Sequence, residues 1–384
     1  MYNVRASLWR VSEQAKQLLR WMATQMASLA GYVFLSKEAT VTYLQGFVQA
    51  QYSAGRVLLP EVVDLVHPAQ TLFPPAEINT FPTRVWRYSP SGGLLSLLRC
   101  GLVVTNKTVL NTDYWTTDSL LDAFAVRSRS HRHTPVIVAP LGHYFDGSLF
   151  VGYYDFMFLV AAKFCRLKET ASETEWQQAL ISYPLLETTY ERDFFTAMGV
   201  SSERLIDSRQ TRLTGDVCYV GNHDNWTHPN PTDVFLLKKH LGSAISTPRK
   251  ARNRVYISRA GRRRVRNEAA LIALLKTYDF QIIEDRPRSL AEQYAIYHNA
   301  SFIMGPHGAS FTNVLWCTPG THLFELFDSP YAPRHFQYLA HLLGLHYTAY
   351  SKDPIGPVDY TAIAQNIDVS IADLKQRLDL ALGR

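Results

Sequence analysis

The sequence lacks the motifs of three common classes of α/β enzyme. No G-x-G-x-x-G fingerprint follows a predicted strand, and there is no Walker phosphate-binding loop and no G-x-S-x-G turn. These absences exclude a dinucleotide-dependent dehydrogenase, a P-loop nucleotidase and an α/β-hydrolase. The chain also has no Asp-x-Asp pair that would hold a divalent metal against a diphosphate.

Cysteine is scarce, and long apolar runs are missing. The chain has 4 cysteines in 384 residues, with no C-x-x-C pair and no histidine at the spacing of a zinc site. No segment reaches about 18 consecutive apolar residues, and the N-terminus has no compact signal-peptide core. These features predict a reduced, cytoplasmic protein with no membrane-spanning segment.

Acidic residues are absent from one strongly basic stretch. Between Arg249 and Arg266 there are nine lysines or arginines and no aspartate or glutamate, in a chain of net charge +6. Such a stretch favours an anionic partner, which by charge alone is nucleic acid, a membrane surface or a phosphorylated ligand. Residues 3–35 add a basic amphipathic pattern. This pattern predicts a helix that either lies on an anionic membrane surface or packs on the protein's own core.

Strands and helices are predicted to alternate regularly in the second half of the chain. Ser289 and Glu292 form a capping-box pattern at the start of one predicted helix. This βαβ alternation is typical of a doubly wound parallel sheet, and the length favours two domains. Four apolar runs are the predicted strands: 254–258, 280–284, 301–304 and 322–327.

Two loops of this predicted sheet form an anion crevice, because the carboxyl ends of parallel strands lie at one edge of a sheet. In the first loop, Gly305 and Gly308 permit a ligand to approach the backbone closely. A helix that begins at Ala309 or Ser310 directs its free N–H groups toward that ligand. The crevice therefore favours anions.

The second loop carries the basic stretch. Arg259 and Arg264 suit a diphosphate, since guanidinium groups match phosphate oxygens and keep their charge. Arg262, Arg263 and Arg266 are expected on a solvated face. Cations gathered in one loop favour a crevice over the broad stripe typical of a duplex-binding surface.

Three acid–base residues lie close to predicted loops. Glu325 ends a strand beside the crevice, where it either accepts ribose hydroxyls or is an exposed capping or salt-bridge carboxylate. His143 follows a predicted strand at 136–139 and lies near Asp146. A histidine there is either a general base oriented by the carboxylate or a packing residue.

Several segments taken together resemble glycosyltransferase family 61. They are ISR at 257–259, R-x-x-N-E at 264–268 and GPHGASFTNVLWCTPGTHLFEL at 305–326. The segment 228–242 resembles the helix that precedes the ISR strand in that family, and the resemblance covers about residues 228–345. The family includes bacterial capsular-polysaccharide enzymes and eukaryotic xylosyl- and N-acetylglucosaminyltransferases.

The resemblance implies a GT-B fold, in which two Rossmann-like domains face each other across a cleft. It also implies an inverting mechanism with no essential metal. The expected division is an N-terminal amphipathic helical region (1–55), an acceptor-side α/β domain (56–215), a nucleotide-sugar-binding domain (216–350) and a C-terminal helix that packs back toward the N-terminal domain (351–384).

The resemblance further implies that a nucleoside-diphosphate sugar, expected to be a UDP-sugar, donates its sugar to a hydroxyl of a polysaccharide or oligosaccharide in bacterial surface glycan synthesis. His143 or Asp146 would be the base. We expect no nucleic-acid partner, and a peripheral contact with the inner face of the membrane. The expected donor-binding residues are Arg259, Arg264, Gly305, His307, Gly308, Ala309, Ser310, Asn313 and Glu325.

Two other functions fit the same residues. A pyruvyl or phosphoryl transferase of polysaccharide synthesis also needs arginines and a crevice. A non-catalytic basic module that binds nucleic acid or anionic lipid predicts weak binding that depends steeply on salt.

Overall fold

The structure is a computed structural model that describes Leu18, Trp21, Met22 and residues 25–112, 129–140, 152–222, 227–245 and 253–384. The chain divides into two compact units. Unit 1 comprises Met1–Ala54 and Phe81–Leu237, and unit 2 comprises Gly55–Thr80 and Lys238–Arg384. Each unit has helices around its own main sheet, so the α/β class expected from the sequence is confirmed.

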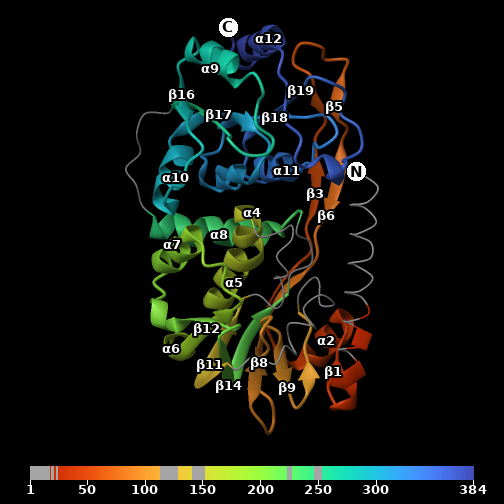
Figure 1. The fold of residues 1–384 in the computed structure, drawn as a ribbon, viewed down its shortest axis with the longest axis vertical. Helices are drawn as coiled ribbons and strands as arrows, with labels where there is room; N and C mark the ends of the chain where they lie inside the picture. The colour runs from red at the N-terminus through yellow and green to blue at the C-terminus, as the bar shows by residue number, and fades with distance from the viewer. Residues whose placement is uncertain are drawn as a thin grey trace. The chain divides into compact units, whose positions relative to one another are not determined.

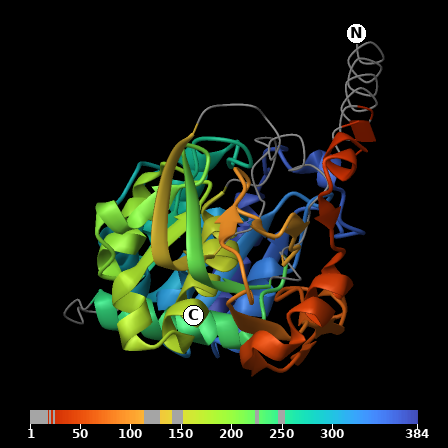
Figure 2. The ribbon, with the colours of Figure 1, turned by 90° about the horizontal axis from the view of Figure 1, so that it is seen from below.

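Unit 1 contains a ten-stranded mixed sheet. Its path is β1-β10-β9-β8-β14-β11-β12-β13, and β7 and β2 branch from β14. β11 and β14 run side by side in parallel, as Figure 2 shows, and their apolar C-terminal halves are buried in the sheet. The strands are β1 (Val33–Phe34), β2 (Val48–Tyr52), β7 (Thr83–Tyr88), β8 (Leu95–Leu97), β9 (Val103–Thr105), β10 (Thr108–Val109), β11 (Ser130–Ala139), β12 (Ala179–Tyr183), β13 (Leu205–Asp207) and β14 (Thr211–Gly221).

The apolar segment that follows β11 is helical, as predicted, but it contains a π-helical turn at η2 (Phe156–Ala161). All six residues of this turn are buried. π-helical turns are rare and often occur at functional sites. The other helical segments of unit 1 are α2 (Lys37–Tyr43), η1 (Gln45–Phe47), α4 (Tyr153–Asp155), α5 (Ala162–Thr170), α6 (Glu173–Gln178), α7 (Thr189–Ala197) and η3 (Ser202–Arg204), and α8 (Pro231–Ala244) continues into unit 2.

Unit 2 is built on a five-stranded, fully parallel sheet in the order β16-β15-β17-β18-β19. The chain passes from β15 to β16 on one side and then returns to β17 on the other, so the doubly wound sheet is confirmed. The topological switch point lies between β15 and β17. The strands are β15 (Asn253–Ile257), β16 (Phe280–Ile283), β17 (Ala300–Pro306), β18 (His322–Phe327) and β19 (His346–Ser351).

Helices cover both faces of this sheet. Figure 1 shows α9 (Glu268–Lys276) and α12 (Ile371–Ala381) on one face, and α10 (Leu290–His298) and α11 (His335–Leu342) on the other. On the first face, Leu271 and Leu374 are fully buried with strand residues such as Tyr256 and Phe324. The capping box at Ser289 and Glu292 is present at the start of α10. Two 3₁₀ helices, η4 (Ala309–Trp316) and η5 (Tyr360–Ala362), complete the unit.

A β-hairpin from the first part of the chain belongs to unit 2. Residues 55–80 contribute β3 (Arg56–Leu59), β4 (Val62–Val63), β5 (Thr71–Phe73) and β6 (Ala76–Asn79). The buried carboxylate of Asp64 accepts hydrogen bonds from Arg377 of α12 at 2.7 and 2.9 Å. Gln337 of α11 donates to the carbonyl of Pro60 at 2.9 Å. These contacts fix the hairpin on α11 and α12.

The two units are divided differently from the expected domains. The boundary falls after Leu237 rather than at 215, and residues 55–80 lie with the second unit. The C-terminal helix packs on the sheet of unit 2, because Leu374 and Leu378 are apolar at the positions that face Leu271 and Tyr350. In the part of the chain that the structure describes, no helix is both long enough and apolar enough to cross a membrane.

Candidate functional site

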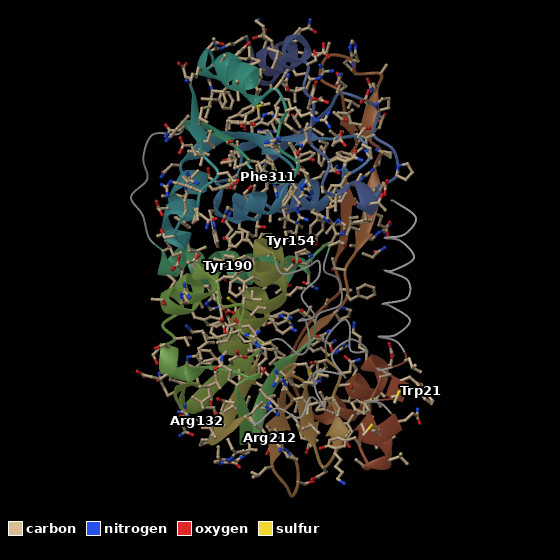
Figure 3. The ribbon with its side chains drawn as sticks, viewed as in Figure 1. Trp21, Arg132, Tyr154, Tyr190, Arg212 and Phe311 are labelled. Atoms are coloured by element: carbon tan, nitrogen blue, oxygen red, sulfur yellow. The ribbon has the colours of Figure 1, made fainter. Side chains whose placement is uncertain are left out.

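The candidate site lies at the carboxyl edge of the unit 2 sheet, at the switch point. β15 ends at Ile257 and β17 ends at Pro306, so the loops carrying Arg259 and Gly308 leave the sheet side by side. In open α/β sheets, ligands bind where the strand order reverses. A Cβ at Gly305 would lie 2.7 Å from the carbonyl oxygen of Ile257, so only glycine permits this spacing. Phe311, labelled in Figure 3, packs against the same glycine.

Arg259 lies directly on the Gly308 backbone. Its Nη1 donates a hydrogen bond to the carbonyl of His307 at 3.2 Å. A Cβ at Gly308 would lie 1.5 Å from that nitrogen. The φ of Gly308 is 173°, which any residue adopts, so glycine is needed here for the space that the guanidinium fills. The structure thus brings together Arg259, His307 and Gly308, which the sequence proposed for one site.

Arg263 is a second buried cation beside this loop. It is only 6% exposed, and its guanidinium carbon lies 5.3 Å from the centroid of the Tyr331 ring. Its backbone has φ 61°, a left-handed conformation that residues other than glycine rarely adopt. Its Nε has no hydrogen-bond partner among the described residues. The expectation that Arg263 lies on a solvated face is therefore wrong.

The positive charge of Arg263 affects the pKa of Arg259. Burial, followed by the positive charges of Arg263 and Arg262, lowers the pKa of Arg259 to about 10. Burial also lowers the pKa of Arg263. The charge of Asp285 opposes the shift of Arg259, and the hydrogen bond with Tyr331 and the charge of Glu325 oppose that of Arg263. Neither arginine forms a salt bridge with a carboxylate of the described residues, and two neighbouring cations of low exposure favour an anionic ligand.

A buried pair, the imidazole of His307 and the carboxylate of Glu325, lies next to the Gly308 loop. His307 Nδ1 lies 2.5 Å from Glu325 Oε1, and the hydroxyl of Tyr347 donates to Glu325 Oε2 at 2.7 Å. Glu325 is 0% exposed and His307 is 3% exposed. Each carboxylate oxygen therefore has a partner within the protein, and the full burial of Glu325 separates it from a ribose hydroxyl in solvent. The alternative of an exposed carboxylate is excluded by the same burial.

The protonation state of the pair follows from its surroundings. Burial lowers the pKa of His307 well below its usual value, and Arg263, His335 and Arg259 lower it further. Burial raises the pKa of Glu325 well above its usual value, although the Tyr347 hydrogen bond and Arg263 oppose this shift. The imidazole is accordingly neutral. The pair fixes the loop without adding a third positive charge beside the arginines.

The helical segment that follows the loop is a 3₁₀ helix, η4. Asn313 Nδ2 donates to Gln293 Oε1 at 2.7 Å and to the carbonyl of Ser310 at 3.0 Å, and Trp316 donates to its Oδ1. The amide of Asn313 thus holds η4 in place. Ser310 and its neighbour Ala309 are partly exposed at the start of η4, on the same loop as Gly308.

The remaining expected site residues divide into two groups. Arg264 is exposed, and its backbone carbonyl accepts a hydrogen bond from Ile367 at 2.9 Å. It lies on the same loop as Arg259 and Arg263 but is not buried with them. His143 and Asp146 lie outside the residues that the structure describes.

Sequence reasoning missed Arg263, Tyr331 and Tyr347. Arg263 was one of five arginines in eight residues, and no local pattern distinguished the buried one. Tyr347 lies on β19, whose two tyrosines and threonine are residue types favoured in strands and were a usable signal for one. A search of the described residues finds no cluster of three histidine, cysteine or acidic residues that could hold a metal ion.

Comparison with known proteins gives a consistent result. The model of the family described as Glycosyltransferase 61 matches residues 117–324. A beta-1,2-xylosyltransferase of Arabidopsis thaliana is 36% identical over 61 residues, which is 16% of this chain and 11% of that protein. An EGF domain-specific O-linked N-acetylglucosamine transferase of Pan troglodytes is 32% identical over 95 residues, which is 23% of this chain and 18% of that protein. The matched segments thus span less than a fifth of either relative.

Among solved structures, the chain aligns with the dodecameric iron-containing heptosyltransferase TibC, determined in complex with ADP-D-beta-D-heptose. The TM-score is 0.33 and the identity is 11%, over 85% of this chain and 93% of that one. A likeness of this size carries no argument about the site.

Proposed function

Because this chain belongs to glycosyltransferase family 61, we propose that it transfers a sugar from a nucleoside-diphosphate sugar, a UDP-sugar, to a hydroxyl of a polysaccharide or oligosaccharide. We further propose that the transfer inverts the anomeric centre and needs no metal. The two relatives are named for xylosyl and N-acetylglucosamine transfer, which supports a sugar nucleotide as the donor.

The observation that carries this proposal is a half-buried guanidinium, that of Arg259, beside the buried one of Arg263. Both lie at the switch point of the sheet; Asp285 and Glu325 act on them only through their charge, and no salt bridge of the described residues joins either arginine to a carboxylate. A diphosphate supplies the missing negative charge and accepts forked hydrogen bonds. Arginine keeps its charge even with a lowered pKa, so the site remains cationic at neutral pH.

The proposed chemistry is a direct displacement. The acceptor oxygen forms a bond to the anomeric carbon while the bond from that carbon to the diphosphate oxygen breaks. The acceptor proton passes to a base, for which we propose His143 or Asp146. Arg259 and Arg263 stabilise the charge that develops on the leaving nucleoside diphosphate, which is the role that a metal plays elsewhere.

The neutral His307 and the Gly308 backbone fix Arg259 in that role. The hydrogen bond from Arg259 to the His307 carbonyl orients the guanidinium before the donor arrives. Groups that are oriented in advance stabilise a transition state without reorganising during the reaction. We propose that the whole chain adopts the GT-B arrangement and acts in the cytoplasm on bacterial surface glycan such as capsule.

The test separates donor binding from base catalysis. Arg259→Ala is expected to raise the donor KM or abolish turnover, whereas His143→Ala is expected to lower kcat and leave donor binding intact. Activity is expected to persist in a chelator and to gain nothing from added Mn²⁺. Absence of saturable binding for every uridine and guanosine diphosphate sugar would refute the proposal, and a fully active His143→Ala variant would refute the base.

We also propose a peripheral contact with an anionic membrane surface. Apolar side chains near the N-terminus recur at helical spacing and are exposed: Leu18, Trp21, Met22, Met26 and Leu29. Trp21, labelled in Figure 3, is 60% exposed and Leu29 is 89% exposed. The same segment of sequence carries an excess of cations. Such a surface binds anionic lipid by apolar burial and by charge.

Vesicle sedimentation tests this contact. Wild-type protein is expected to sediment with vesicles that contain phosphatidylglycerol and to stay in solution with pure phosphatidylcholine. The double variant Trp21→Glu, Leu29→Glu is expected to stay in solution with both. Equal sedimentation of the variant and the wild type would overturn the proposal.

A further inference from the structure

A series of hydrogen bonds leads from β19 to Arg259. The hydroxyl of Tyr347 on β19 donates to Glu325 Oε2 at 2.7 Å, and Glu325 Oε1 lies 2.5 Å from His307 Nδ1. The carbonyl of His307 accepts a hydrogen bond from Arg259 Nη1 at 3.2 Å. Tyr347 is therefore linked to Arg259 through two residues, although β17 and β18 separate β19 from β15 in the sheet.

The middle of this series is closed to solvent. Glu325 is 0% exposed and His307 is 3% exposed. Burial raises the pKa of Glu325, and the Tyr347 hydroxyl opposes this shift, as does the charge of Arg263. A buried carboxylate that loses a donor must take up a proton or turn toward another group, because no water replaces the lost bond. The orientation of Glu325, and with it that of His307, therefore depends on the Tyr347 hydroxyl.

Hairpin 55–80 packs next to this series, and Figure 1 shows its strand β5 beside β19. Tyr347 packs against a hydrophobic cluster to which the hairpin contributes the first three members: Val62, Leu72, Phe73, Phe327, Ala332 and Ala349. The Phe73 ring meets the Phe327 ring edge-on at 5.8 Å and 84°, and the Phe327 ring stacks on His307 at 5.2 Å and 24°. The hairpin therefore supports Tyr347 directly and His307 through Phe327.

We propose that Tyr347 is a positioning residue for Arg259 and that hairpin 55–80 keeps Tyr347 in place. Tyr347 acts through Glu325 and His307 and does not itself touch the donor. Side chains that meet a ligand keep a productive orientation when further hydrogen bonds and packing hold them from behind. This inference rests on the proposed function and deepens it, because it adds a residue of β19 to the control of donor binding.

A double-mutant cycle on uridine diphosphate binding tests whether Tyr347 acts through Arg259. Calorimetric titration compares the wild type, Tyr347→Phe, Arg259→Ala and the double variant. Tyr347→Phe keeps the ring and removes the hydroxyl, and it is expected to weaken uridine diphosphate about tenfold. In the Arg259→Ala background the same change is expected to have an effect of less than about twofold, since the group that it positions is gone.

Tyr350 of the same strand provides the matched control. Its hydroxyl accepts a hydrogen bond from the N–H of Ser370 at 2.9 Å, and its ring packs in the hydrophobic cluster on the other face of the sheet. Tyr350→Phe also removes one hydroxyl from β19. It is expected to bind uridine diphosphate as the wild type does, because its hydroxyl has no link to Arg259 through Glu325.

The hairpin has its own comparison. Phe73→Leu removes the ring that meets Phe327 and is expected to weaken uridine diphosphate about threefold, because Tyr347 and His307 lose part of their support. Leu58→Ala truncates a side chain of the same hairpin that is 59% exposed, and it is expected to leave binding unchanged. Equal binding by the two variants would overturn the part assigned to the hairpin.

The outcomes separate this inference from the proposed function. If Arg259→Ala weakens uridine diphosphate but Tyr347→Phe binds as the wild type does, the positioning role is overturned and the diphosphate site stands. The same conclusion follows if Tyr347→Phe has an equal effect in both backgrounds. If the wild type binds neither uridine nor guanosine diphosphate, both proposals are overturned.

Urea denaturation shows whether each unliganded variant is folded. If Tyr347→Phe is unfolded, Glu325→Gln takes its place in the cycle, because an amide has one acceptor oxygen where the carboxylate has two. Glu325→Gln is expected to weaken uridine diphosphate in the wild-type background and to lose this effect in the Arg259→Ala background. An equal effect in both would overturn the positioning role.

Discussion

Two buried arginines, one in each unit, have opposite surroundings. Arg166 of α5 is 0% exposed, and its Nε lies 2.6 Å from the equally buried carboxylate of Asp233. Its other nitrogens donate to the carbonyls of Arg84 and Asn222. Arg263 of unit 2 is nearly as buried, yet it has no ion pair among the described residues, and its guanidinium lies 5.3 Å from the Tyr331 ring.

This difference distinguishes an arginine that stabilises the fold from one that we propose binds a ligand. A buried charge is strongly unfavourable unless it is paired or hydrogen-bonded. Arg166 meets that requirement within the protein and so holds α5, β7 and α8 together. Arg263, beside Arg259, has Tyr331 as its partner but no ion pair among the described residues, and we propose that an anionic ligand supplies its counter-charge. Removal of Arg166 should therefore affect stability, and removal of Arg263 should affect binding.

The largest expected effect is on stability in unit 1. Arg166→Leu removes the ion-pair partner of the buried Asp233 carboxylate, which keeps only the charge of the buried Lys163 nearby, and is expected to lower the free energy of unfolding by about 3–5 kcal/mol. Urea denaturation measures the change. The double variant Arg166→Leu, Asp233→Leu removes both charges and is expected to recover most of the loss. If the single variant is as stable as the wild type, the pair does not hold unit 1 together.

The next effect is on nucleotide binding in unit 2. Arg263→Asn removes the guanidinium but keeps a residue that tolerates the left-handed backbone. We expect uridine diphosphate to bind roughly 10- to 100-fold more weakly, because a charge-assisted contact to phosphate is lost. The unliganded variant should unfold at a similar urea concentration, since Arg263 makes no ion pair. A large loss of stability with unchanged uridine diphosphate binding would show that Arg263, like Arg166, stabilises the fold and does not bind the ligand.

A smaller effect is expected from one added methyl group. Gly308→Ala places a Cβ where Arg259 Nη1 lies, so the guanidinium must move away from the His307 carbonyl. We expect roughly tenfold weaker nucleotide binding from this displacement. Gly261→Ala on the neighbouring loop adds its Cβ to open space and is the matched control. Equal binding by both variants would show that Arg259 does not contact the nucleotide.

The smallest effect is expected for an arginine in a third kind of environment, an exposed ion pair. Arg56 and Glu77 pair across the β3–β6 hairpin with side chains that are 68% and 40% exposed. Arg56→Ala is expected to leave the free energy of unfolding nearly unchanged, because water screens the pair. Urea denaturation of Arg56→Ala and of Arg166→Leu under the same conditions tests whether the loss of stability depends on the burial of the ion pair rather than on its presence.

Much of unit 2 was predictable from local sequence. The apolar runs that form β15 to β18 and the capping box at Ser289 follow from short-range rules of periodicity and capping. These rules also placed Arg259 and Gly308 at one sheet edge, because parallel strands with helical crossovers bring their carboxyl ends together. The anion site followed from topology and charge alone.

The remaining features depend on contacts between distant segments. Hairpin 55–80 packs on unit 2 through Asp64 and Arg377, which are 313 residues apart in sequence. The choice of Arg263 over Arg264 as the buried arginine depends on one left-handed residue in the loop. Glu325 reaches His307 rather than a ligand because Tyr347 on β19 closes its other side. No local pattern encodes these pairings.

Thermal unfolding of the wild-type protein and of Arg263→Asn with increasing uridine diphosphate tests the central claim most directly. The account predicts that the wild type gains stability with ligand, by about 2.7 kcal/mol at a hundredfold excess over its Kd. Arg263→Asn is predicted to start from a similar melting temperature and to gain much less. The account is contradicted if neither uridine nor guanosine diphosphate stabilises the wild type, or if the variant gains as much as the wild type.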